Sequence, residues 1–298
     1  MTASMTPRPA ATQPPPPSPE STPFDPSGEA TPVVTTNPPT GAHDIDTSVP
    51  QSARVWNYWL GGKDNFAADR RIGDQIAAAN PHIAEIALAQ RAFLVRVVTH
   101  LVHAGIRQFL DIGTGLPTAN NTHQVAQTLA PESRVVYVDH DPLVLVHARA
   151  LLTSSADGAV DYIDADLTDP DSILSQAAHT LDFDQPIALL LLGVTAHLTD
   201  DAQAYAIVRR LVDAVPAGSY LALCDDTNVI HPDAMDEMVR QWNAAGENPR
   251  VNRTPDGIAG FFDGLELLKP GVVSVARWRP DTSGVVDVDD FGGLAHKP

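Results

Sequence analysis

The pattern of apolar positions changes its period along the chain. Between residues 52 and 104 the apolar residues recur at helical spacing in three stretches, 52–62, 66–79 and 83–104, and the first of these ends at paired glycines. From residue 108 onward, short runs of consecutive apolar residues alternate with amphipathic stretches. The pattern therefore predicts a helical lead-in followed by alternating strands and helices.

Five apolar runs have the length of buried strands, and a helical stretch follows each of them. The runs are QFLDI (108–112), VVYVD (135–139), VDYID (160–164), IALLLLGV (187–194) and SYLALCD (219–225). The helices are expected around 122–130, from Pro142, from Pro170 with Asp169 as its cap, from near Thr199, and around 232–245. Nearly continuous apolar strands separated by helices are typical of a parallel sheet covered on both faces.

The end of this region has a different pattern. Residues 265–278 contain two apolar runs joined only by Lys269-Pro270-Gly271. So short a link permits an antiparallel pair and excludes a parallel crossover. The fold class expected from the pattern is therefore α/β, with a mostly parallel sheet and a late antiparallel hairpin.

Composition sets the limits of the globular region. Half of the 26 prolines lie in the first 50 residues, which contain few apolar runs, so 1–47 is predicted to be a disordered Pro-rich tail. A Pro-rich ligand for another protein is the alternative for this segment. The helical lead-in, which is also interpreted as a lid, then occupies 48–104 and the sheet domain 105–280, and the acidic tail 281–298 is expected to fray.

Charge and cysteine content limit the partners and the compartment. The net charge is −18, from 37 acidic and 19 basic residues without a basic cluster, which argues against a nucleic-acid partner. Cys224 is the only cysteine, no signal sequence is recognisable, and the longest apolar run, 187–194, is too short to span a bilayer. A soluble cytoplasmic protein without a membrane partner is expected, and its oligomeric state is left open.

Glycine and aspartate residues follow the first three predicted strands, where ligands bind in open parallel sheets. Gly113 and Gly115 would let a ligand approach the backbone. The carboxylate of Asp139 could accept hydrogen bonds from both hydroxyls of a ribose, and that of Asp164 or Asp166 could accept a hydrogen bond from the exocyclic amine of adenine. Each residue could instead be structural, as a chain turn or a helix cap, but the ordered set favours a nucleoside ligand.

The residues of the first turn favour one adenosine-containing cofactor over another. The dinucleotide fingerprint G-x-G-x-x-G requires a third glycine where this chain has Thr118. Asp111, at the tip of the preceding strand, is suited to orient the loop or to approach a cationic ammonium group. S-adenosylmethionine, which carries an amino acid and lacks a pyrophosphate, fits these features better than NAD.

Six long segments within 48–280 carry a family resemblance. They are RVWNYWLGGKDNFAADR (54–70), RAFL (91–94), GIRQFLDIGTGLPTANNTHQVAQ (105–127), VVYVDHDPLVLVHARALL (135–152), DADLTDP (164–170) and FFDGLELLKPGVVSVARWRP (261–280). They resemble the S-adenosyl methyltransferase family that was once grouped as a domain of unknown function and is common in actinobacteria. The resemblance implies a Rossmann-like class I methyltransferase fold with a seven-stranded sheet and S-adenosylmethionine as cofactor. The acceptor, a small molecule or a peptide methylated on O or N, is left open.

The segment GGKDNF (61–66) is interpreted as a lid over the cofactor. Lys63, Asn65 or Arg91 could meet the methionyl carboxylate, since charge-assisted bonds suit that group. The alternative is a plain interhelical turn, in which the paired glycines stop one helix and Asp64 or Asn65 caps the next. The complete expected cofactor set is Asp111, Gly113, Thr114, Gly115, Asp139, His140, Asp166, Leu167, Gly193, Lys63, Asn65, Tyr58 and Arg91.

His197 is the candidate catalytic residue. Methyl transfer is an in-line displacement on a sulfonium carbon, and a base is required only if the acceptor must lose a proton. His197 follows the fourth strand and matches a histidine in the family's pattern, although packing or capping is the alternative role. An ordinary imidazole would make activity rise near pH ~6.5. No Cys/His spacing suggests a metal site and no Ser-His-Asp elbow is present.

Two other functions compete with a methyltransferase. A non-catalytic protein that binds S-adenosylmethionine would keep the same cofactor residues, because methyl transfer needs no obligatory catalytic side chain. An NAD-dependent oxidoreductase on a similar sheet is disfavoured by Thr118 and by the terminal hairpin.

Overall fold

The computed structural model describes residues 45–151, 154–245 and 248–298. Apart from 45–47, the predicted Pro-rich tail lies outside these residues. Within the described ranges, no helix is both long enough and apolar enough to cross a membrane.

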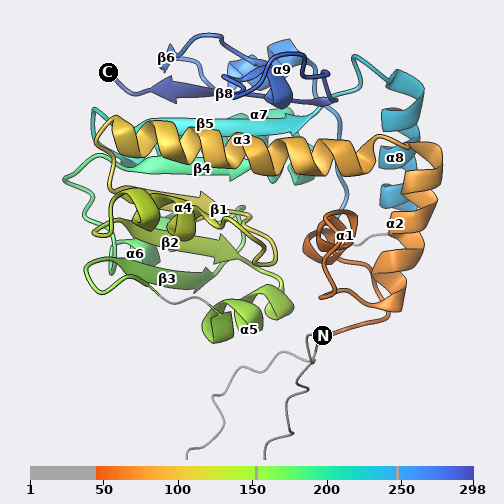
Figure 1. Cartoon of the computed structure of the whole chain (residues 1–298), viewed down its shortest axis with the longest axis horizontal. Helices are drawn as coiled ribbons and strands as arrows, with labels where there is room; N and C mark the ends of the chain where they lie inside the picture. Colours follow the sequence, from red (N-terminus) through yellow and green to blue (C-terminus); the bar gives the residue numbers. More distant parts are fainter. Residues whose placement is uncertain (1–44, 152–153, 246–247) are drawn as a thin grey trace, which may run out of the picture. The chain divides into compact units, whose positions relative to one another are not determined.

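A single sheet forms the centre of the described chain (Figure 1). Its strands are β1 Gln108–Ile112, β2 Arg134–Asp139, β3 Ala159–Asp164, β4 Ala188–Leu192, β5 Tyr220–Asp226, β6 Glu266–Leu267, β7 Val273–Ser274 and β8 Asp290–His296. They lie in the order β3-β2-β1-β4-β5-β8-β6, and β7 pairs with β8. Strands β1 to β5 are parallel, whereas β8 is antiparallel to β5. The predicted mostly parallel sheet with an antiparallel end is confirmed.

Helices cover both faces of this sheet, and the long helix α3 crosses one of them (Figure 1). The helices are α1 Ser52–Trp59, α2 Ala67–Ala79, α3 Ile83–His103, α4 Thr122–Leu129, α5 Pro142–Leu151, α6 Pro170–Ala177, α7 Asp201–Ala214, α8 Pro232–Ala245 and α9 Pro255–Gly260, with 3₁₀ helices at Thr195–His197 and Val275–Arg277. Because successive side chains of a strand point to opposite faces, Phe109 joins the core under α3 and Leu110 joins the core under α6 and α7.

The C-terminal segment does not fray, which corrects the expectation for 281–298. Residues Asp290–His296 form β8, which pairs along its whole length with β5, and the two apolar runs of 265–278 pair with β8 instead of with each other. At least one glycine of this segment, Gly292, is required by packing. A Cβ atom on Gly292 would lie 2.5 Å from the carbonyl oxygen of Leu223, so only glycine fits there.

The strand order places the ligand-binding edge of the sheet. From β1 the chain continues outward to β2 and β3, and then returns to β4 on the other side of β1. The connections that follow β1 and β4 therefore leave in opposite directions at their carboxyl ends. In open parallel sheets this reversal point is where a crevice for ligands forms.

Candidate functional site

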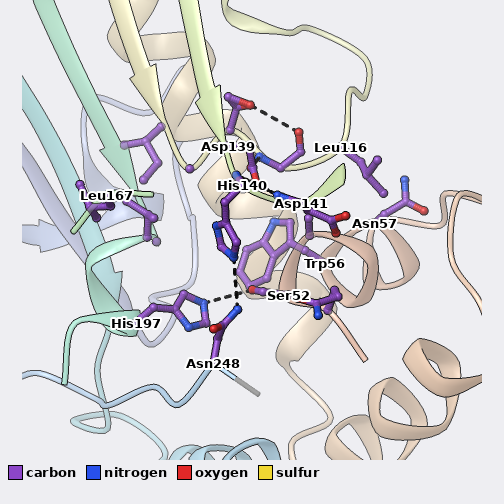
Figure 2. Close-up of a pocket in the computed structure, with 18 of the residues that line it drawn as sticks. Ser52, Trp56, Asn57, Leu116, Asp139, His140, Asp141, Leu167, His197 and Asn248 are labelled. Carbon is purple, nitrogen blue, oxygen red and sulfur yellow. Dashed lines mark hydrogen bonds between the residues drawn. The ribbon is translucent and has the colours of Figure 1, made fainter. Parts of the chain in front are cut away.

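A cavity of about 260 Å³ lies at this edge of the sheet. Its walls come from the turns after β1 to β4, from α1 and α3 of the helical lead-in, and from residues 248–250 after α8 (Figure 2). The sequence-predicted residues that line it are Asp111, Gly113, Thr114, Gly115, Asp139, His140, Asp166, Leu167, Gly193, Arg91 and His197. Asp164, the alternative to Asp166, is not among the lining residues.

The turn after β1 has a backbone that only glycine adopts easily. Gly113 and Gly115 have φ angles of +73° and +67°, in the left-handed region. A Cβ atom on Gly113 would also lie 2.4 Å from Cγ2 of Val194, in the turn after β4. Both conformation and space therefore require glycine at position 113, and the exposed backbone of this turn faces the cavity.

Asp139, at the end of β2, holds two of the cavity's turns together. Its carboxylate accepts hydrogen bonds from the backbone N–H of Gly115 at 2.8 Å, of His140 at 2.8 Å and of Asp141 at 3.0 Å. Burial raises the pKa of this carboxyl group, although the N–H groups of Asp141 and Gly115 oppose the shift. The acid expected to bind a ribose therefore also fixes the glycine turn in place (Figure 2).

Asp111, in β1, and Arg91, on α3, both contact the segment that connects the glycine turn to α4. Asp111 is buried and accepts a hydrogen bond from the Thr122 hydroxyl at 2.6 Å. Burial raises the pKa of Asp111 to about 6, and the Thr122 bond and the nearby Arg91 guanidinium limit the rise. Arg91 donates to the backbone carbonyls of Ala119 and Asn120, so its charge is held beside the β1–α4 loop.

Both ring nitrogens of His197 have a partner in the structure. Nδ1 lies 3.3 Å from the carbonyl oxygen of Pro249, and Nε2 lies 3.2 Å from Oγ of Ser52, the first residue of α1 (Figure 2). A carbonyl oxygen only accepts, so Nδ1 carries the hydrogen and the Nε2 lone pair accepts from the Ser52 hydroxyl. The edge of the imidazole also packs on Trp242.

The environment of His197 corrects its expected pH response. Burial lowers the pKa of this imidazole to about 4, and the Arg250 guanidinium and His140 add to the shift, while hydrogen bonds with the Pro249 and Asn248 backbone oppose it. His197 is therefore neutral at pH 7 and able to accept a proton.

Three predicted cofactor residues, Tyr58, Lys63 and Asn65, do not line the cavity. Lys63 is exposed. The Asn65 amide donates to Oδ1 of Asn57 at 2.9 Å, and the Tyr58 hydroxyl donates to Asp74 at 2.6 Å. The side chain of Asn65 is thus hydrogen-bonded within the helical lead-in, as in the alternative of an interhelical turn.

Helix α1, which lies within the segment 48–104 predicted as helical lead-in and lid, contributes to the wall of the cavity. Ser52 and Trp56 of this helix line the cavity (Figure 2). Arg54 of the same helix is buried, with Nε 3.6 Å from Oδ1 of Asp69 and 3.7 Å from Oδ2 of Asp141. The arginine that begins the aromatic-rich segment RVWNYW (54–59) was the signal in the sequence for these contacts. The two ion pairs attach α1 to α2 and to the turn after β2.

Residues 248–250 form a second wall that the sequence interpretation missed. Asn248 lies 3.3 Å from Nε2 of His140, and Arg250 forms a buried ion pair with Asp226 at the end of β5 (Figure 2). A second buried pair, Arg253 with Asp225 at 2.9 Å, holds the same segment three residues further on. The paired aspartates that end β5 and the two arginines were the signal for this arrangement.

Comparison with known proteins decides the family. The model of a family described as S-adenosyl methyltransferase matches residues 38–298. This chain belongs to that S-adenosyl methyltransferase family. The family resemblance predicted from sequence is confirmed.

Two solved structures are similar to this methyltransferase over most of its length. A crystal structure of a DUF574 family protein from Streptomyces avermitilis MA-4680 is 42% identical, with a TM-score of 0.82, and the match covers 85% of this chain and 100% of that one. A putative methyltransferase from Thermobifida fusca YX is 40% identical, with a TM-score of 0.78, and the match covers 85% of this chain and 97% of that one. No curated protein matches the sequence.

The cofactor of this methyltransferase is S-adenosylmethionine, as predicted. The cavity has the groups that such a ligand requires: a glycine turn with an accessible backbone, and aspartates after β1, β2 and β3. Oδ2 of Asp141, in the cavity wall, is buried and has no hydrogen-bond partner among the described residues. This oxygen lies 3.7 Å from Nε of Arg54, so its charge is balanced by that guanidinium.

Proposed function

We propose that this methyltransferase transfers a methyl group from S-adenosylmethionine to a hydroxyl oxygen of a small, uncharged acceptor, with His197 as the general base. The observation that carries the proposal is the neutral imidazole of His197, whose Nε2 lone pair accepts from a hydroxyl in the cavity wall. An O–H acceptor must lose its proton as the methyl group arrives, and a neutral imidazole can take it.

The distribution of charge in the cavity supports a hydroxyl acceptor over an ammonium one. The carboxylates that line the cavity all lie at the carboxyl ends of β1, β2 and β3 or on the turns that follow them; they belong to Asp111, Asp139, Asp141 and Asp166. The wall beside His197 instead carries Asn248, Pro249 and Arg250, and Arg250 is paired with Asp226. A cationic amine would find no compensating carboxylate at this end of the described cavity.

Each side chain has a role in this proposal. Gly113, Gly115 and Asp139 would hold the adenosine part, and Arg91 with Asp111 would face the amino-acid part. The bound cofactor supplies an electrophilic methyl group on a positively charged sulfur. Residues of α1 and residues 248–250 line the cavity on the side of His197, which limits the access of water to the reacting groups.

The proposal is tested by offering matched acceptors. Radiolabelled S-adenosylmethionine is incubated with the full chain and with pairs of compounds that differ only in the nucleophile, such as phenol with aniline and benzyl alcohol with benzylamine. We expect label in the hydroxyl member of a pair and none in the amine. Label in the amine alone contradicts the proposal. Calorimetric binding of the cofactor without transfer to any hydroxyl compound, over a broad panel, would indicate a binding protein.

Asp139→Ala is expected to weaken S-adenosylmethionine binding by about 1.5–3 kcal/mol, because bonds to a charged acceptor are lost and the glycine turn is released. Isothermal calorimetry measures the change. Asp164→Ala is the matched control, since Asp164 is the partner of Asp139 in the β2–β3 register and lies outside the cavity lining. Equal affinities of the wild type and Asp139→Ala would remove Asp139 from the cofactor site.

A cytoplasmic location is proposed on composition. Cys224 is the only cysteine of the chain, and it is free and buried. A chain without disulfides is typical of a reducing compartment.

A further inference from the structure

Ser52 and His197 are brought together from distant parts of the chain. They are 145 residues apart in sequence, and Ser52 Oγ lies 3.2 Å from His197 Nε2 (Figure 2). Both residues line the cavity. The only other ring nitrogen of His197 faces the Pro249 carbonyl. Any proton that His197 accepts must therefore arrive at Nε2, the ring nitrogen that lies beside the Ser52 hydroxyl.

The tautomer of His197 is fixed by a rigid neighbour. The segment that carries the Pro249 carbonyl is held by two hydrogen bonds between the backbone of Arg250 and the side-chain amide of Asn243. The Arg250 N–H donates to Oδ1 at 2.8 Å, and Nδ2 donates to the Arg250 carbonyl at 3.0 Å. The buried Arg250–Asp226 pair holds the same residue. With Nδ1–H directed to that carbonyl, Nε2 has only its lone pair, and the Ser52 hydroxyl must be the donor.

We infer that Ser52 is a further catalytic residue, which relays the acceptor's proton to His197; this rests on the proposed function of His197 as base. The acceptor O–H gives its proton to Ser52 Oγ, and Ser52 gives its own proton to Nε2. The acceptor oxygen forms the bond to the methyl carbon as the methyl–sulfur bond breaks, and the electron pair of that bond stays on sulfur. The positive charge of the sulfonium ends on the imidazolium, so atoms and charge balance.

The attachment of α1 gives this relay its geometry. Ser52 lies two residues before Arg54, whose buried guanidinium pairs with Asp69 of α2 and with Asp141 beside the cofactor turn. The N–H of Asp141 in turn donates to the carboxylate of Asp139. The position of the serine hydroxyl is therefore set by the same groups that shape the cofactor's turn.

The first test observes the His197 ring directly and needs no acceptor. Long-range ¹H–¹⁵N spectra are recorded on the full chain with ¹⁵N-labelled histidine and S-adenosylhomocysteine, and the His197 signals are identified by their loss in His197→Gln. We expect hydrogen on Nδ1 in the wild type, and in Ser52→Ala a downfield shift of Nε2, because its lone pair loses a donor. Ser52→Thr should keep the wild-type pattern. Hydrogen on Nε2 in the wild type, or identical spectra for Ser52→Ala, would overturn the relay.

The second test uses the hydroxyl compound that the matched panel selects. Ser52→Ala should lower kcat by ~10²-fold with little change in cofactor affinity, and Ser52→Thr should restore most of the rate. Ser48→Ala is the control, because the Ser48 hydroxyl is exposed and bonds only to Asp46. A large loss in His197→Gln with a normal rate in Ser52→Ala refutes the relay alone. A normal rate in His197→Gln refutes the proposed function. If no panel compound is methylated, the spectra decide.

Discussion

His197→Ala should lower kcat by ~10²-fold or more and leave the affinity for S-adenosylmethionine unchanged. The neutral imidazole is the base in the proposed reaction, and its removal leaves the proton of the acceptor hydroxyl without this base. Initial rates on the selected hydroxyl compound and calorimetry on the same preparations separate the two effects. A near-normal rate would make the residue structural and favour an acceptor that is already ionised.

The pH dependence of the same enzyme follows from the burial of this ring. Because the pKa of His197 is about 4, we expect protonation of this base to lower kcat, measured at saturating S-adenosylmethionine, only as the pH approaches 4. Protonation of Asp111, whose pKa is about 6, is expected to act on the affinity for the cofactor instead. The stability contribution of His197 has the same direction as its effect on kcat. It is fully present above the unfolded imidazole's pKa of about 6.5 and is lost as the pH falls toward the folded value, because the unfolded chain binds the proton first. His103→Ala, at an exposed position, should leave the rate profile unaltered.

Arg54→Ala is expected to lower the free energy of unfolding by about 3–5 kcal/mol. The side chains of Arg54, Asp69 and Asp141 are 2%, 0% and 6% exposed, so the substitution leaves two buried carboxylates without their counter-ion. It also removes the Arg54 bonds to the backbone carbonyls of Asp46 and Val49. Urea denaturation followed by circular dichroism measures the loss.

A matched arginine and a compensating substitution make this prediction specific. Arg71→Ala, on the exposed side of α2, should change the free energy of unfolding by less than about 0.5 kcal/mol. Adding Asp69→Asn and Asp141→Asn to Arg54→Ala should recover part of the loss, because the buried negative charges are removed. A loss below about 1 kcal/mol in Arg54→Ala would place these pairs with ordinary surface salt bridges and contradict a structural role for them.

The elements that the sequence determined are those specified by local chemistry. The five residues of β1 are all buried, so a continuous apolar run marked the strand at the residues observed. Helix α6 begins at Pro170 because Asp169 accepts from the N–H of Ser172 at 3.1 Å, a cap that can be recognised in the sequence itself. The glycine turn and Asp139 follow strands in the same way, and the strand order brings them to one edge.

Tertiary structure decided the features that depend on distant partners. Strand β8 is specified by its fit against β5, where Gly292 leaves room for the Leu223 carbonyl, and nothing in its own residues resembles a buried strand. The helical lead-in was predicted to act as a lid, but the way in which α1 is attached beside the cavity depends on a distant partner, because Arg54 lies next to Asp141 only in the folded chain.

The protonation of His197 shows the same division. The residue could be selected from its place after β4, but its pKa of about 4 and its hydrogen bond with Ser52 arise only when α1 and residues 248–250 close around the ring. Residue type and spacing determine which groups are available. Their burial and their long-range partners determine the charge each group carries and the direction in which it donates, because desolvation and hydrogen bonding act only in the folded chain.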